Sequence, residues 1–278
     1  MIKTCLSLFL LVHAIFCFGQ SKQEKEIIEE GTKLYKSEMA SWYGTDIFLS
    51  KFADRRERIG GYFSYLVDDK AVCVFFSNSE TPIIIGTFTF DSTYNVNTAL
   101  IDGQERGLTK QEYDILSIRQ AAIEEFQSDT LFKSYNEMNP NFIPVIDNKG
   151  KRVYILTGPK NQGIVVFGND YLLTFDQQNN LTGKKQLHKN IIPIEYGKVG
   201  DKQIISTMHS HLPESGDLIS ATDICTLKLY SKYARWRQHY VISKENVSIW
   251  DCQKELLVVM TRKAWDKIAD NQKKKSRN

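Results

Sequence analysis

Apolar residues recur at helical spacing near the start of the chain and at strand spacing through much of the rest. Between Glu24 and Met39 they alternate with charged residues at the spacing of one helix face, which predicts an amphipathic helix. Gly44 interrupts this pattern, so we expect the helix to end before it. Residues 60–90 contain three aromatic-rich apolar runs separated by polar turns, which predicts three strands.

A second helical pattern covers residues 108–135 and is compatible with one long helix or two. Thr109 followed by Glu112 has the spacing of a capping box at its start. Turn-forming residues dominate positions 136–141, so we place a domain boundary there. The predicted organisation is an N-terminal helix–strand–helix α+β unit over residues 20–136, a second α+β unit over residues 137–262 and a basic C-terminal tail over residues 263–278.

The apolar pattern of the second unit predicts several strands followed by a helix. Sequence letters "DNKG" predict a hairpin, and further strands are expected over residues 163–176, 191–197 and 202–211. A helix is expected from Ala221 to about Trp236, and a second hairpin turned at "KEN" follows it. The segment 255–270 fits either a strand or a short helix.

The first nineteen residues have the features of a secretory signal peptide, with one early lysine and a short apolar run. We expect cleavage after Gly19, an extracytoplasmic protein and no membrane span in the mature chain. Acylation at Cys17 is the alternative. The large Phe16 before it is not the small residue that lipoprotein processing favours.

Charge argues against a nucleic-acid partner. The formal net charge is +3, of which Lys3 supplies one positive charge and the last seven residues supply four, so the body between them is near −2. We interpret the basic end as a disordered, solubilising tail.

Three cysteines, Cys73, Cys225 and Cys252, remain after signal removal, so at most one disulfide can form within the mature chain. Pairing of Cys225 with Cys252 and three structural thiols are both open interpretations. Either way, the chain is no disulfide scaffold.

The stretch "TMHSHLPESGDLISATD" holds the strongest candidate chemistry. On a strand, His209 and His211 present two imidazoles to one side. Ser220 and Asp223 have the spacing of a helix cap, which would bring a carboxylate to a defined place. Together they could form a two-His, one-Asp zinc shell with a fourth position for water. The alternative is a strand and a capped helix without metal.

This stretch resembles the signature of the JAB/MPN (JAMM) metalloprotease family, His-Ser/Thr-His-Pro followed by Ser-x-x-Asp. Leu212 is one inserted residue before Pro213, and the spacing from Pro213 to Asp223 is as in the family. The resemblance implies a mixed sheet with a flanking helix over residues 137–262 and zinc held by His209, His211 and Asp223. It also implies that Ser220 donates a hydrogen bond to the developing oxyanion.

The resemblance further implies a general-base glutamate on an earlier strand, yet the sequence has none between Glu137 and Glu195. Glu38, supplied by the N-terminal helix, is our candidate. Others are Glu137, Glu195, Asp170 and Asp176, each of which is also explained as an ordinary surface carboxylate. His188 is either a third imidazole ligand or a loop residue. His239 either donates to a ligand or packs in the core.

Two functions are therefore predicted. The first is a secreted zinc-dependent hydrolase that cleaves peptide or isopeptide-type amide bonds of a protein or peptide substrate. The second is a non-catalytic metal-binding or partner-binding envelope protein on the same fold. Nucleophile-elbow, phosphate-loop and Cys-x-x-Cys motifs are absent from the sequence.

Overall fold

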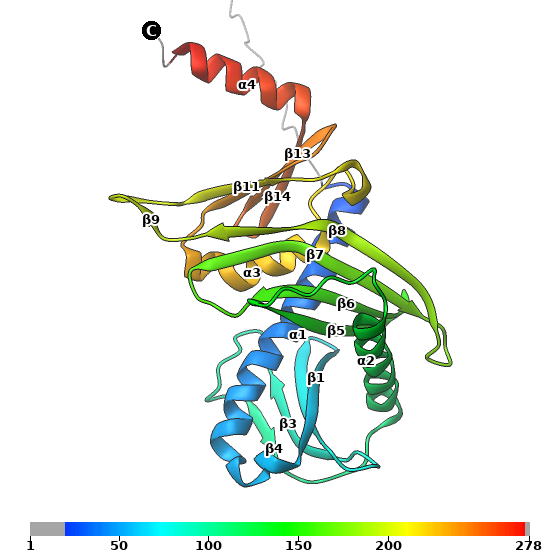
Figure 1. Cartoon of the computed structure of the whole chain (residues 1–278). Helices are drawn as coiled ribbons and strands as arrows, with labels where there is room; N and C mark the ends of the chain where they lie inside the picture. Colours follow the sequence, from blue (N-terminus) through cyan, green and yellow to red (C-terminus); the bar gives the residue numbers. More distant parts are fainter. Residues whose placement is uncertain (1–19, 276–278) are drawn as a thin grey trace, which may run out of the picture.

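The computed structural model describes residues 20–275, so the predicted signal peptide lies outside the described residues. Three four-stranded sheets and four α-helices build an α+β protein, which confirms the predicted fold class (Figure 1). The predicted strands and hairpins of both units are present, except that the predicted strand over 202–211 is divided into two short strands of different sheets. The segment 255–270 contains both a strand and the start of a helix. No helix within residues 20–275 combines the length and apolar content needed to cross a bilayer.

The first helix, α1 (Lys22–Lys51), is longer than predicted and runs straight through Gly44. A Cβ atom at position 44 would lie 2.7 Å from the Cys73 Sγ atom on the neighbouring sheet. The glycine therefore permits close packing of helix on sheet instead of ending the helix. The expectation that the helix stops before Gly44 was wrong because a tertiary contact, not a turn, requires this glycine.

The first sheet is antiparallel and follows a short 3-10 helix, η1 (Ala53–Arg58). Its strand order is β1-β2-β3-β4. Phe48 of α1 stacks on Phe75 of this sheet with ring centroids 4.1 Å apart, at the centre of an apolar core. The strands are β1 (Ile59–Val67), β2 (Lys70–Ser77), β3 (Ile84–Phe90) and β4 (Leu100–Asp102).

One helix, α2 (Lys110–Ser128), occupies the second helical segment and begins with the predicted capping box of Thr109 and Glu112. Its apolar residues join two cores. Ile115 packs with the first sheet, and Ile118 packs with the second sheet. The two predicted units therefore share α2 across the proposed boundary.

The second sheet has the antiparallel order β5-β6-β7-β8. Its strands are β5 (Met138–Asp147), β6 (Gly150–Pro159), β7 (Ile164–Phe175) and β8 (Leu181–Glu195). β8 begins ten residues earlier than the strand predicted over residues 191–197, and it places His188 within the sheet. The loop interpretation of His188 was wrong because pairing with β7, rather than apolar alternation, defines this part of β8.

The third sheet has the order β11-β12-β13-β14 and is mixed, because β11 runs parallel to β12 and the other pairs are antiparallel. Helix α3 (Ala221–Ala234) packs against α1 and β7, and its apolar residues share a core with this sheet. The strands are β11 (Ser206–Ser210), β12 (Gln238–Ile242), β13 (Asn246–Asp251) and β14 (Leu256–Thr261), preceded by the hairpin of β9 (Lys198–Val199) and β10 (Lys202–Gln203). A short 3-10 helix, η2 (Pro213–Ser215), connects β11 to α3.

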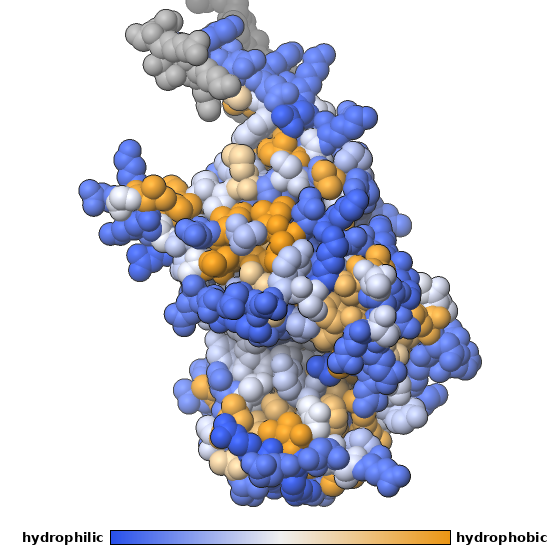
Figure 2. All heavy atoms as spheres, viewed as in Figure 1, coloured by the Kyte–Doolittle hydropathy of each residue, from blue (hydrophilic) through white to orange (hydrophobic). Residues whose placement is uncertain are grey.

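The chain end is ordered as far as it is described. Helix α4 (Arg262–Lys275) projects from the third sheet, so a disordered tail is wrong over this range (Figure 1). Its surface is largely hydrophilic, whereas apolar surface appears at the level of the third sheet (Figure 2). The ring of Trp265 packs 5.3 Å from that of Tyr240, which ties the helix to β12.

The three cysteines within residues 20–275 are free thiols. Cys73 and Cys225 are buried and Cys252 is half-buried. The pairing of Cys225 with Cys252 is therefore not formed, and burial raises the pKa of Cys73 and of Cys252.

Candidate metal centre

The four histidines within residues 20–275 gather at one place between the second and third sheets. His209 lies on β11, His211 directly follows β11, His188 lies on β8 and His239 lies on β12. All four side chains are buried. The sequence has five histidines and the fifth, His13, lies outside the described residues.

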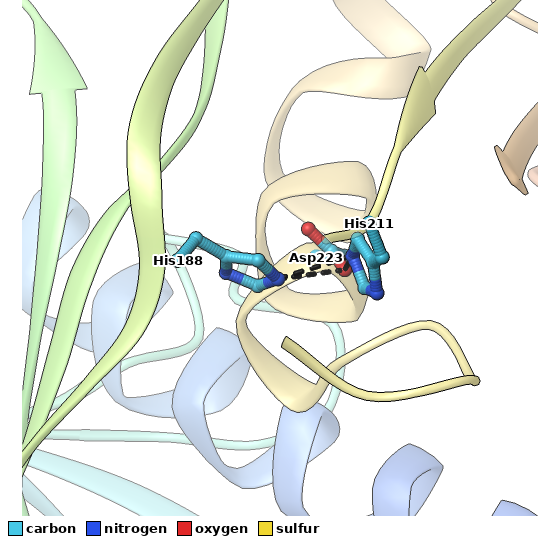
Figure 3. Close-up of side chains that lie close together, drawn as sticks. All are labelled: His188, His211 and Asp223. Carbon is cyan, nitrogen blue, oxygen red and sulfur yellow. Dashed lines mark hydrogen bonds and ion pairs between the residues drawn. The ribbon is translucent and has the colours of Figure 1, made fainter. Parts of the chain in front are cut away.

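Three side chains converge closely enough to hold a metal ion: His188, His211 and Asp223 (Figure 3). The Nε2 atoms of His188 and His211 lie 3.0 Å apart. The Asp223 Oδ2 atom lies 3.1 Å from His211 Nε2 and 3.9 Å from His188 Nε2. Each of the three comes from a different element, so a bound ion would connect β8, the end of β11 and α3.

His209 lies beside this group rather than within it. Its Nε2 atom is 3.6 Å from Asp223 Oδ1, is buried and has no hydrogen-bond partner among the described residues. A buried imidazole nitrogen without a partner is rare and is available as a ligand. Of the three ligands predicted from the sequence, the structure thus joins His211 and Asp223 with His188, and places His209 next to them.

Local sequence explains how Asp223 is held. Ser220 is the N-cap of α3, its hydroxyl accepts from the Asp223 backbone amide at 3.0 Å, and Asp223 Oδ2 accepts from the Ser220 amide at 2.9 Å. This is the predicted capping box. The Ser220 hydroxyl also lies 2.8 Å from Asp223 Oδ2, so its contacts are those of a residue that orients the carboxylate.

Polar partners behind the cluster orient two of the imidazoles. Asp170, paired with His188 across β7 and β8, places Oδ1 2.8 Å from His188 Nδ1. His209 Nδ1 lies 2.8 Å from His239 Nε2, and His239 Nδ1 lies 2.7 Å from Thr207 Oγ1. If His239 donates to Thr207, it accepts from His209 Nδ1–H, and the lone pair of His209 Nε2 is then free to bind a cation.

The electrostatics of the cluster favour a cation. Burial raises the pKa of Asp223, but the surrounding imidazoles outweigh burial and hold the pKa well below its ordinary value. Burial also lowers the pKa of His188, but Asp170 and Asp223 raise it to about 9. Burial lowers the pKa of His209 to about 4. Two buried carboxylates are thus balanced by imidazoles alone, and a divalent ion would neutralise both.

Of the predicted general-base candidates, Asp170 contacts the cluster through His188, and the others lie elsewhere. Glu38 is buried on α1 and lines a cavity of about 40 Å³ together with Arg119, Tyr62 and three serines, none of which belongs to the cluster. The Glu137 carboxylate accepts from Asn161, and Asp176 closes the turn after β7. Glu195 is exposed at the end of β8. Within residues 20–275, the carboxylates in contact with the cluster are therefore Asp170 and Asp223.

Sequence reasoning considered His188 only as an alternative and weighed Asp170 only as a base. Their pairing depends on a register shift in the β7–β8 ladder around Asp170, which local sequence does not reveal. The signal available in the sequence was the small number of histidines, five in all. Four of these five lie at the site.

Comparisons with models of known protein families, with curated proteins and with solved structures gave no significant match to this chain. The resemblance to the JAB/MPN family therefore rests on the sequence stretch quoted above.

Proposed function

We propose that this protein binds a single zinc ion in a closed site formed by His188, His211 and Asp223, with His209 as the fourth ligand. The observation that carries the proposal is the convergence of His188, His211 and Asp223, beside which the partnerless His209 Nε2 atom lies 3.6 Å from Asp223 Oδ1. Four-coordinate zinc with bonds of 2.0–2.2 Å places its ligand atoms roughly 3.3–3.6 Å apart. Within the group of His188, His211 and Asp223 Oδ2 the separations are 3.0, 3.1 and 3.9 Å. His209 Nε2, which is 3.6 Å from Asp223 Oδ1, would have to move toward the other two imidazoles to complete the shell.

The donor set supports zinc over other divalent ions. Imidazole and carboxylate ligands in a tetrahedral arrangement suit zinc, whereas magnesium and calcium prefer shells of oxygen. Metal-ligating histidines usually hydrogen-bond an outer partner through their second ring nitrogen. Asp170 is positioned to be that partner for His188, and His239 for His209.

The proposed role of the ion is structural. A site whose four positions are all filled by protein ligands is typical of structural zinc, whereas catalytic zinc keeps one position open. His188, His211, Asp223 and His209 are each less than a tenth exposed. The ion would lock β8, β11 and α3 together, and it would do so in the extracytoplasmic setting that the first nineteen residues predict.

Zinc titration against a competing chelator tests this proposal. The wild-type chain should bind one zinc, His188→Ala, His211→Ala and Asp223→Asn should lose it, and Glu195→Gln, an exposed change on β8, should keep it. Zinc binding that survives the ligand substitutions would overturn the assignment. Parallel titrations with Ni²⁺ and Cu²⁺ give the affinity order of the site, in which Cu²⁺ should bind more tightly than zinc, as at most nitrogen–oxygen sites.

Amide hydrolysis is the second candidate function. Its support is the arrangement of a strand, a His-Ser-His sequence and a Ser-capped helix bearing Asp223, which the JAB/MPN resemblance implies. Zinc would supply Lewis acidity toward an amide carbonyl. His209 would have to leave the ion to open a position, and Asp170, bound to His188, is the carboxylate available to accept a proton. A chain that holds one zinc yet cleaves neither peptide nor isopeptide amides would exclude this candidate.

A further inference from the structure

A cavity of about 830 Å³ lies where α3 ends and the chain turns into β12. Its wall comes from α1, the last turn of α3, the segment joining β10 to β11 and the turn between β13 and β14. None of the four clustered histidines lines it. Its volume is within the range of small-molecule sites, about 300–1,000 Å³.

Positive charge dominates this wall. Four cationic side chains line the cavity, whereas Glu255 is the one acidic residue of the lining and is paired with Lys228. The cations are Lys228, Lys232, Arg235 and Arg237. Among the described residues, no carboxylate lies within ion-pair distance of Lys232, Arg235 or Arg237. Three uncompensated cations around one hollow make it an attractive place for an anion.

The backbone brings these cations together. Arg235 ends α3 in the left-handed conformation, with φ of 58°, a place where glycine or asparagine is usual. The reversal at Arg235 puts Lys232, in the last turn of α3, and Arg237, just before β12, at the same cavity. A cationic side chain at a helix C-terminus also interacts favourably with the helix dipole.

The same cavity has an aromatic wall. Tyr35, which is half-buried, presents its ring to the cavity, and Trp236 and Trp250 form the layer behind the wall, at 3% and 1% exposed. Both indole N–H groups are buried without an acceptor in the described part of the chain. The Lys228 ammonium lies 5.1 Å from the centre of the Tyr35 ring. A flat apolar group could pack against the Tyr35 ring while its charged end meets the cations.

We propose that this cavity binds a small organic phosphate. Guanidinium groups match the geometry of phosphate oxygens through paired N–H donors, and a dianion uses more than one of the unpaired cations. The phosphate would contact Arg235, Arg237 and Lys232, and the organic part would lie against the aromatic wall. This site is independent of the proposed zinc centre.

Calorimetric titration of the full chain with three probes tests this assignment: phenyl phosphate, inorganic phosphate and phenol. Phenyl phosphate should bind most tightly, because only this probe offers both charge and a ring. The double variant Arg235→Asn with Arg237→Gln should weaken its binding at least tenfold. Asparagine adopts the left-handed backbone readily, so the fold should be retained, and circular dichroism and thermal unfolding check this.

The matched control is Arg56→Gln with Lys70→Gln, which removes two exposed positive charges from the first unit. Its affinity for phenyl phosphate should stay within twofold of wild type, and chelator treatment should change nothing. An equal loss in both double variants, tighter binding of inorganic phosphate than of phenyl phosphate, or no saturable binding of any probe at millimolar concentration would each overturn the assignment.

Discussion

Two helices of this protein begin with the same local device and differ in what surrounds it. Thr109 and Glu112 cap α2, and Ser220 and Asp223 cap α3, with reciprocal hydrogen bonds between hydroxyl, carboxylate and backbone amides in both. Each acid is almost completely buried. The cap hydrogen bonds alone therefore do not offset the cost of burying either charged carboxylate, so each needs further partners.

Glu112 receives that compensation from a permanent cation. Arg106 donates to both Glu112 oxygens at 2.7 and 2.8 Å, and the Tyr65 hydroxyl donates at 2.9 Å. Burial raises the pKa of Glu112, but these donors and the Thr109 amide outweigh it and lower the pKa to about 2. Its charge is neutralised by the protein itself.

Asp223 faces His188, His209 and His211 instead, and no lysine or arginine of residues 20–275 forms an ion pair with it. Imidazoles supply positive charge only when protonated, and as neutral groups they supply lone pairs to a metal. The comparison teaches that the partners of the acid, not the capping motif, separate a structural cap from a candidate ligand.

Of the predicted effects, the stabilisation that zinc gives should be the largest, because zinc would bind at Asp223 and not at Glu112. With zinc at a thousandfold excess over its dissociation constant, the free energy of unfolding should rise by about 4 kcal/mol. His188→Ala should abolish this rise, and urea unfolding with and without chelator measures it. If zinc raises the free energy of unfolding of His188→Ala by the same amount, the ion binds at another site. The difference between Asp223 and Glu112 would then not hold.

Exchange of each cap acid for its amide comes next. Glu112→Gln should cost about 3 kcal/mol of stability because it leaves Arg106, itself a third exposed, without its partner, and should leave zinc affinity unchanged. Asp223→Asn should reduce zinc affinity at least about 100-fold. Chelator competition and urea unfolding of both variants measure the two effects. Loss of zinc by Glu112→Gln would contradict this division.

A third buried acid, Glu38, sharpens the comparison because it has neither cap nor full compensation. Burial raises its pKa to about 7 although the Arg119 charge acts in the opposite direction. The folded protein therefore holds this proton more tightly than the unfolded chain, so the stability that Glu38 contributes is complete below pH 4.5 and is lost as pH rises through 7.

Glu38→Gln should remove this loss. The variant should exceed wild type by about 2 to 3 kcal/mol at pH 8 and show no such gain at pH 4. Urea unfolding across this pH range measures the difference. A gain that does not vary with pH would show that Glu38 ionises normally.

The smallest predicted effect is the loss of either cap hydroxyl, that of Thr109 or that of Ser220. Thr109→Ala and Ser220→Ala should each cost about 1 kcal/mol of stability in the absence of metal. Only Ser220→Ala should also weaken zinc binding, by about tenfold, because its hydroxyl lies against Asp223 Oδ2. Parallel zinc titrations of the two variants make the comparison, and equal zinc affinities would remove any role of Ser220 in holding the ligand.

Both caps could be predicted from sequence because each depends on residues three apart. The strand carrying His209 could be predicted for the same local reason. His188 could not, because its stretch of β8 is polar and is defined by pairing with β7. Asp170 became its partner through a register shift, and Gly44 became a packing residue through a contact with Cys73. The missed features all depend on residues far apart in the chain.

Metal content measured by elemental analysis tests the central claim most directly. The purified chain, reconstituted with zinc and then freed of excess metal, should hold one zinc per molecule, and His188→Ala and Asp223→Asn should hold none while Glu195→Gln holds one. A wild-type chain that retains no zinc after this treatment would contradict the claim that these histidines and Asp223 form a metal centre.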